Sequence, residues 1–107
     1  MTLKIINPIK IIKIEKSNVE NKRYKVTLNN GQTYNFGLDG GQTYIDHHSR
    51  RMREAYKARH YVLEQDLIDT LEPSASVFSY FLLWGPSTSL ERNIKTLNKL
   101  FRMHNIH

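Results

Sequence analysis

Acidic and histidine side chains near the middle of the chain are the residues that could do chemistry. Asp46-His47-His48 and the more distant His60 are of the types that bind zinc or serve a small metal-dependent nuclease. If His47 and His60 share one helix, a rise of ~1.5 Å per residue places them about 20 Å apart, and the neighbours His47 and His48 point in different directions. We therefore predict no metal site, and histidines that cap or pack at helix ends.

A glycine-rich loop ahead of a helix can hold phosphate with its backbone N–H groups. Residues 37–41 form such a segment, but the Gly-x-x-x-x-Gly-Lys-Ser/Thr spacing is absent and Asp39 places a negative charge there. No serine, threonine or lysine stands in a nucleophile motif. The sequence thus predicts no catalytic residue, no cofactor and no small-molecule substrate, and so a protein that is not an enzyme.

The arginine-rich segment 44–60 is predicted to form one basic helix, with an aspartate or serine at 46–49 as its cap. Helical spacing places Met52, Ala55 and Tyr56 on an inner side. The other side carries four candidate contact residues, Arg50, Arg51, Arg53 and Lys57. Two interpretations stay open: this side contacts phosphate or an acidic protein, or it is a solvated face partly neutralised by Glu54.

Two further residues of this half have a structural and a functional interpretation. Arg59 falls on the side of Met52 and Ala55, so it is predicted to form a structural ion pair inside the fold with an acid of the next segment, Asp66, Asp69 or Glu72. Trp84 ends an apolar aromatic run that is predicted to be core. Because Gly85-Pro86 follows, Trp84 could instead lie at the rim of the core and anchor a protein partner.

Charge and composition restrict the partners. The 107 residues carry a formal net charge of +6, and the basic excess lies within the first sixty. This excess favours nucleic acid, an anionic membrane surface or an acidic protein. The absence of cysteine excludes disulfides and thiolate metal sites, and it favours a reducing compartment. The N-terminus does not resemble a signal peptide, and no apolar run approaches the ~20 residues of a membrane span.

Periodicity predicts an α+β fold in one domain, residues 1–107. Strands at 9–16, 24–28 and 33–36, with a hairpin turn at Asn30-Gly31, predict a three-stranded antiparallel β-meander over residues 9–37. Three or four helices are expected to pack on one face of it. After the basic helix 44–60, a helical part over 62–102 is predicted to comprise helices at 62–71, at 77–84 and from about 88 to 102.

The last of these helices is amphipathic. Its inner stripe is Leu90, Ile94, Leu97 and Phe101. Its outer stripe consists of four cations that are further candidates for contact with a partner or with phosphate, Arg92, Lys95, Lys99 and Arg102.

The chain resembles a family of small uncharacterised domains of nucleocytoplasmic large DNA viruses and some bacteriophages. The resemblance is carried by Tyr24-x-Val26, Phe36-Gly37, Tyr44-x-x-His47, Tyr56-x-x-Arg59-His60 and Leu82-Leu83-Trp84-x-Pro86. It spans roughly residues 22–101. Thr43, Ser49 and Met52 depart from the pattern, which has an acidic residue, an aspartate and an arginine at those positions.

The resemblance implies a viral protein, and it supplies no catalytic residues because the family has no established activity. Small, basic, non-enzymatic viral proteins are most often virion components. We therefore expect a minor capsid or cement-like structural protein in the virion, or in the cytoplasm or nucleus of an infected cell, with other virion proteins as partners. The alternative is a nucleic-acid-binding module that contacts phosphates without reading sequence. A metal-dependent nuclease is the third hypothesis.

Overall fold

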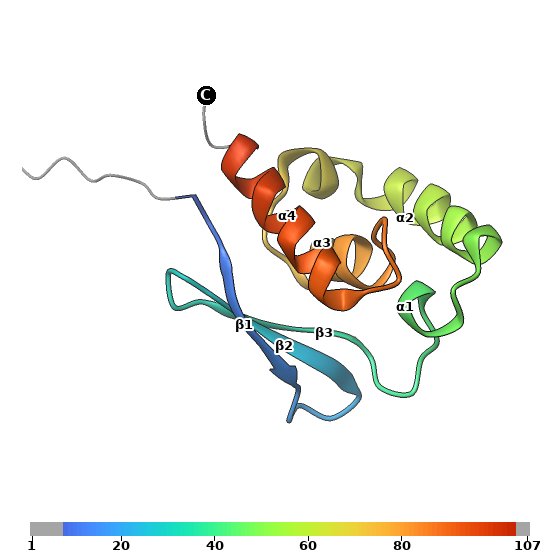
Figure 1. Ribbon diagram of the computed structural model, residues 1–107, viewed down its shortest axis with the longest axis horizontal. Helices are drawn as coiled ribbons and strands as arrows, with labels where there is room; N and C mark the ends of the chain where they lie inside the picture. Colours follow the sequence, from blue (N-terminus) through green and yellow to red (C-terminus); the bar gives the residue numbers. More distant parts are fainter. Residues whose placement is uncertain (1–7, 105–107) are drawn as a thin grey trace, which may run out of the picture.

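A computed structural model describes residues 8–104 (Figure 1). The signal-peptide prediction depends largely on residues 1–7, which lie outside the described residues together with 105–107. The three strands are β1 (Ile11–Lys16), β2 (Lys22–Leu28) and β3 (Thr33–Leu38), and they form one antiparallel sheet in the order β1-β2-β3. The predicted meander and the α+β class are confirmed, although the first strand begins at Ile11 rather than at residue 9.

The turn between β2 and β3 lies at Asn30-Gly31, as predicted. Gly31 has a φ of +89°, which residues with a Cβ rarely adopt. The Asn30 side chain accepts a hydrogen bond from the backbone N–H of Gln32 at 2.9 Å. This turn sets the register that pairs Tyr24 with Phe36, and the register directs the apolar residues of both strands to one face.

The helices follow the sheet and lie on one side of it (Figure 1). They are α1 (Tyr44–His47), α2 (Arg50–Thr70), α3 (Ala75–Phe78), a π-helical segment η1 (Ser79–Leu83) and α4 (Leu90–His104). Two predicted boundaries are wrong. The predicted helix 44–60 is interrupted at His48, and the helix predicted separately at 62–71 is the second half of α2.

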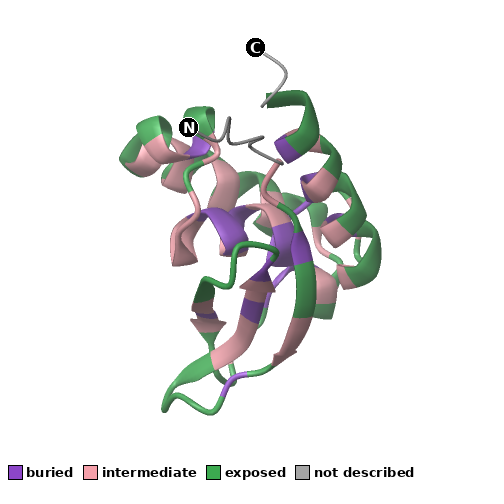
Figure 2. Ribbon diagram, turned by 90° about the vertical axis from the view of Figure 1, so that its left-hand side faces the viewer, coloured by how far each residue is buried: buried purple, intermediate pink, exposed green. Residues whose placement is uncertain are grey.

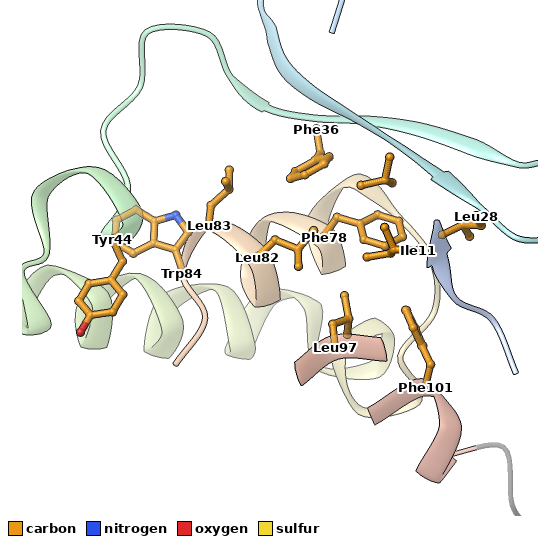
Figure 3. Close-up of a cluster of buried hydrophobic side chains, with 11 residues drawn as sticks. Ile11, Leu28, Phe36, Tyr44, Phe78, Leu82, Leu83, Trp84, Leu97 and Phe101 are labelled. Carbon is orange, nitrogen blue, oxygen red and sulfur yellow. The ribbon is translucent and has the colours of Figure 1, made fainter. Parts of the chain in front are cut away.

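The core lies between the sheet and the segment α3–η1. Val26, Leu28 and Phe36 of the sheet are fully buried, and so are Phe78 and Leu82. Figure 2 shows the buried residues gathered where the strands face the helices, and Figure 3 shows the Phe36 and Phe78 rings side by side, with centroids 5.9 Å apart. Each buried side chain of this size stabilises the fold by about 1.5–3 kcal/mol. The apolar run 77–84 is the most deeply buried segment, as predicted.

Helix α4 closes the core with Leu97 and Phe101, both on its predicted inner stripe (Figure 3). Ser89 caps its start by accepting a hydrogen bond from the backbone N–H of Arg92 at 3.2 Å. Asn98 fastens α4 to the edge of the sheet. Its amide accepts from the N–H of Ile11 at 2.8 Å and donates to the carbonyl of Ile11 at 3.2 Å. Both backbone hydrogen-bonding groups of Ile11 thus have a partner within the chain.

Candidate functional site

The start of the basic segment differs from the prediction because of two local backbone features. His48 adopts a left-handed conformation (φ 58°, ψ 24°), which ends α1. Histidine is among the few residues enriched there. Ser49 then caps α2 by accepting a hydrogen bond from the N–H of Met52 at 3.2 Å. Asp46 caps α1 instead, where it accepts from the backbone N–H and the hydroxyl of Thr43 at 2.9 and 2.8 Å.

Arg53 points into the fold and not to solvent. Its Nε donates to the carbonyl oxygen of Gly85 at 2.7 Å and to that of Trp84 at 3.2 Å. The guanidinium also lies 5.5 Å from the centre of the Tyr44 ring, and only 18% of the side chain is exposed. Arg53 is therefore poorly placed for the partner or phosphate contact expected of it, because this side chain holds the turn after η1 against α2.

Lys57 lies on the same inner side of α2. Its ammonium is 4.8 Å from the centre of the Tyr80 ring. Burial lowers the pKa of Lys57, and the nearby positive charge of Arg53 lowers it further. Lys57 is thus only partly accessible, so its predicted role as a free surface contact is also not supported by its position.

Trp84 is a core residue and not a rim anchor. It is 8% exposed, and its indole stacks on the Tyr56 ring at 4.2 Å with an interplanar angle of 6°. The Tyr56 ring also stacks on the His60 ring, with the two ring centres 4.0 Å apart. Burial raises the pKa of Tyr56 to about 12. The anchor interpretation of Trp84 is therefore wrong, because the partner that it stacks on belongs to its own chain.

His60 and Glu64 form the most polar part of this inner side. The His60 Nδ1 lies 3.0 Å from a carboxylate oxygen of Glu64, and the Ser76 hydroxyl and the His60 ring together lower the pKa of that carboxyl. A serine is activated when the histidine itself contacts the hydroxyl. Here the carboxylate lies between them, so this arrangement does not build a hydrolytic triad.

Two adjoining hollows, about 360 and 300 Å³, lie beside this inner side of α2, at the end of β3. They share Gly37, Leu38, Tyr56 and Ser79. Among residues 8–104, no three histidine or acidic side chains gather closely enough to hold a metal ion. In the same part of the chain, no helix is long and apolar enough to cross a membrane.

Arg59 is exposed, and the internal ion pair predicted for it does not form with any acid of the described residues. The reason is geometric. Arg59 and Asp66 lie seven residues apart in α2, on either side of the bend at Glu64. Asp69 instead accepts a hydrogen bond from the Tyr61 hydroxyl at 2.9 Å.

Of the three residues that the sequence assigned to the inner side of this helix, Tyr56 packs on Trp84 as expected, whereas Met52 and Ala55 face solvent. Met52 is 51% exposed, Val62 77% and Leu63 73%, and Ala55 and Arg59 are exposed with them. We call these five residues, Met52, Ala55, Arg59, Val62 and Leu63, the outer face of α2. Large apolar side chains this exposed are unusual when they lie next to one another, and such patches mark interaction surfaces.

The remaining predicted contact residues are at the surface. Arg50 and Arg51 are exposed in the first turn of α2. The four cations of the outer stripe of α4 are exposed as well, at Arg92, Lys95, Lys99 and Arg102. These six side chains are therefore accessible to a partner, and their contact with protein or phosphate stays a prediction.

The sheet and the basic segment are the part of the chain that is similar to a protein family. Residues 12–60 match a family of unknown function (DUF5754). The matched stretch comprises the strands, α1 and the first half of α2. This part of the chain is therefore similar to a family of small domains whose function is not known. It ends before the buried segment α3–η1 and α4. Neither a curated protein nor a solved structure matches the chain.

Proposed function

We propose that this protein is a non-enzymatic protein-binding module, and that it serves as a minor capsid or cement-like structural component of a virus particle. The observation that carries the protein-binding role is the outer face of α2, where Val62 and Leu63 are more than two-thirds exposed beside Arg59. Methionine and arginine are enriched in protein interfaces, and buried apolar contacts supply their affinity.

This surface favours protein over phosphate as the principal partner of α2. A phosphate-binding helix needs accessible cations, and apolar neighbours add little to such binding. Two of the four cations of α2 that were candidates for phosphate contact, Arg53 and Lys57, are turned toward the fold. The cations that stay accessible lie beside exposed apolar side chains, and this combination suits an acidic or amphipathic protein surface.

The viral setting is supported by the resemblance of residues 22–101 to domains of large DNA viruses, and the base rate for small basic viral proteins supports a place in the particle. Other virion proteins are then the partners. The location would be the virion, or the cytoplasm or nucleus of the infected cell during assembly.

The test is to follow the protein through purification of particles of the virus that encodes it. We expect it to remain with the capsid shells after the genome has been released, and we expect Leu63→Asp to remove it from them. Thr96→Asp, an exposed change on α4 with the same charge change, is the matched control and should leave the association unchanged. Absence of the wild-type protein from purified shells would overturn the proposal.

A second function is favoured by a separate observation on α4. Its four outer cations recur at intervals of three and four residues from Arg92 to Arg102, and all are exposed. They form a line about 15 Å long at ~1.5 Å per residue, and such a line can follow a phosphate backbone. If α4 binds nucleic acid, duplex DNA affinity should fall steeply with salt, and Lys95→Ala with Lys99→Ala should reduce the slope by about 0.9 per lost phosphate contact.

A further inference from the structure

Helix α2 carries its charges in two opposite halves. Residues 50–60 hold five Lys/Arg and one acid, whereas residues 61–72 hold four acids and no Lys or Arg. Arg50, Arg51 and Arg59 of the first half are exposed, and Asp66 and Asp69 of the second half are exposed as well. Helix α2 thus has a basic half and an acidic half, and each half has charged side chains that are exposed to solvent.

The order of these halves is the reverse of the one that stabilises a helix. The N-terminus of a helix carries partial positive charge and favours acids, and the C-terminus favours bases. The first turn of α2 has no acid and begins with Arg50 and Arg51, and its last turn has no base. Contacts within the chain account for Arg53 and Lys57. They do not account for the exposed Arg50, Arg51 and Arg59, but a partner that lies along the helix would.

The exposed apolar side chains lie where the two halves meet. Met52, Ala55, Arg59 and Val62 follow one another at alternating steps of three and four residues up to the bend at Glu64, which is the spacing of a seam between two packed helices, and Asp66 follows just after the bend. All five are exposed. Helix α2 runs along the outside of the helical layer (Figure 1), so this seam is open to a partner.

The backbone bends at the same place. Glu64 has a non-helical conformation (φ −130°, ψ 29°), and residues 62–67 line a hollow of about 480 Å³ there. A side chain of a partner helix has room to enter at this bend. The apolar junction, Val62 and Leu63, is therefore the natural centre of a contact.

We propose that the occupant of the outer face of α2 is a second copy of this chain, whose α2 packs antiparallel on it about a two-fold axis near Val62 and Leu63. This inference rests on the proposed protein-binding role of the same face. With the axis there, Arg59 of each copy lies opposite Asp66 of the other, and each basic half covers an acidic half. In an antiparallel pair, the positive end of each helix dipole lies beside the negative end of the other, which is favourable.

A second copy fits better than an unrelated acidic protein. An acidic surface would complement residues 50–60 but would place like charges opposite Asp66 and Asp69, which disfavours the contact. Only a partner that presents acidic residues to the basic half and basic residues to the acidic half is complementary to the whole helix. A copy turned by 180° has this order by symmetry, since in a two-fold contact residue i meets j and j meets i.

Sedimentation equilibrium of the full chain tests the proposal. The wild type should approach twice the monomer mass as its concentration rises to about 500 µM, because a contact through one helix lies at the small end of stable interfaces. Added salt should weaken the dimer. Arg59→Asp and Asp66→Arg should each raise the dissociation constant about tenfold or more, because each places like charges opposite one another.

Recovery of the dimer by charge-swapped variants distinguishes this geometry from a general effect of charge. An equimolar mixture of Arg59→Asp with Asp66→Arg should form a heterodimer, and the double variant should recover self-association, because both arrangements again set opposite charges face to face. Lys16→Asp, an exposed change on the sheet with the same charge change as Arg59→Asp, is the control and should not affect the mass. Circular dichroism confirms that each variant is folded; the changed residues are exposed.

A wild type that stays monomeric throughout the range overturns the proposal, and so does a mixture of the two variants that fails to associate. Its failure is distinguishable from failure of the proposed function. A monomeric wild type whose retention on capsid shells is still lost in Leu63→Asp would overturn self-pairing alone. A dimeric wild type that is absent from the shells would support self-pairing and overturn the role in the particle.

Discussion

Arg23 of β2 donates two hydrogen bonds to Asp46 of α1, from Nη1 to Oδ2 and from Nη2 to Oδ1, both at 2.7 Å. The pair lies at the surface, where the two side chains are partly covered, at 20% and 23% exposure. The hydrogen bonds from Arg23 hold the pKa of the Asp46 carboxyl well below its usual range, against the effect of burial. The pair joins the sheet to the first helix, so it determines where the basic segment starts.

Replacing Arg23 by glutamine should lower the free energy of unfolding by about 1.5–3 kcal/mol, because the change removes a bidentate charged contact and leaves a partly buried carboxylate unpaired. Urea denaturation measures this. Lys22→Gln, one position earlier and exposed, is the control and should change stability by less than about 0.5 kcal/mol. Equal effects of the two changes would show that the pair contributes nothing beyond surface charge.

The same pair predicts a loss of stability in acid. The folded-state pKa of Asp46 is lowered, so its contribution is fully present above the unfolded value of about 3.9 and is lost as the pH falls below it. Unfolding free energies of the wild type and of Arg23→Gln, measured from about pH 7 to about pH 3, should therefore differ most at neutral pH, and the difference should begin to narrow as the pH falls below about 4. A difference that stays constant over this range would contradict the assignment.

The strands and the core were readable from the sequence because their signals are local. Tyr24, Val26 and Leu28 alternate with polar residues, and Asn30-Gly31 is a strong hairpin signal on its own. The density of apolar residues in the run 77–84 was enough to identify the most buried segment. These features need no knowledge of distant contacts.

The orientation of α2 could not be read in this way. Its inner side is selected by the carbonyl groups of Trp84 and Gly85, which bind Arg53, and by the stacking of Trp84 on Tyr56. These partners lie about thirty positions away in the sequence. Met52 and Ala55 looked like an inner stripe by spacing alone, but spacing does not tell which side has a partner to pack on.

One missed feature did have a local signal. Thr43 and Asp46 have the spacing of a capping box, which marks the start of α1. By contrast, neither the partner of Asp46 on β2 nor the left-handed conformation of His48 is encoded in a short motif. The break between the two helices was therefore beyond sequence reasoning.

Arg53 and Arg50 should behave differently although both are arginines of the same helix. Arg53→Gln should lower the unfolding free energy by about 1.5–3 kcal/mol, because two carbonyl groups lose a charged donor. Arg50→Gln, which is exposed, should change it by less than about 0.5 kcal/mol. Chemical denaturation of the two variants side by side decides this. A larger loss for Arg50→Gln would mean that the helix is rotated from the orientation described.

Trp84 provides a spectroscopic test of the aromatic stack, since it is the single tryptophan of the chain. Tyr56→Leu should cost about 1 kcal/mol of aromatic pairing, and it should shift the indole emission because one face of the ring loses its cover. Tyr61→Leu is the matched control, because the Tyr61 hydroxyl donates to Asp69 and not to a member of the stack. Emission spectra of the folded variants record the difference. An unchanged spectrum in Tyr56→Leu would contradict the stacking.

Asn93 is a polar residue placed where an apolar one would be expected on the inner side of α4. It is fully buried, and its amide donates to the carbonyls of Leu82 and Ser87 at 2.9 and 2.8 Å and accepts from the N–H of Ser87 at 3.0 Å. The amide thus satisfies three backbone groups of the tight turn that carries Gly85.

Asn93→Leu keeps the approximate volume but leaves those three backbone groups without partners, so it should destabilise the protein by about 3 kcal/mol in spite of its added hydrophobicity. Thr96→Ala, an exposed change on the same helix, should stay within about 0.5 kcal/mol of the wild type. Thermal and urea unfolding of both variants provide the measurement. If Asn93→Leu were as stable as the wild type, the turn would have to satisfy its backbone without this amide, and Asn93 would not be what fixes the turn between η1 and α4.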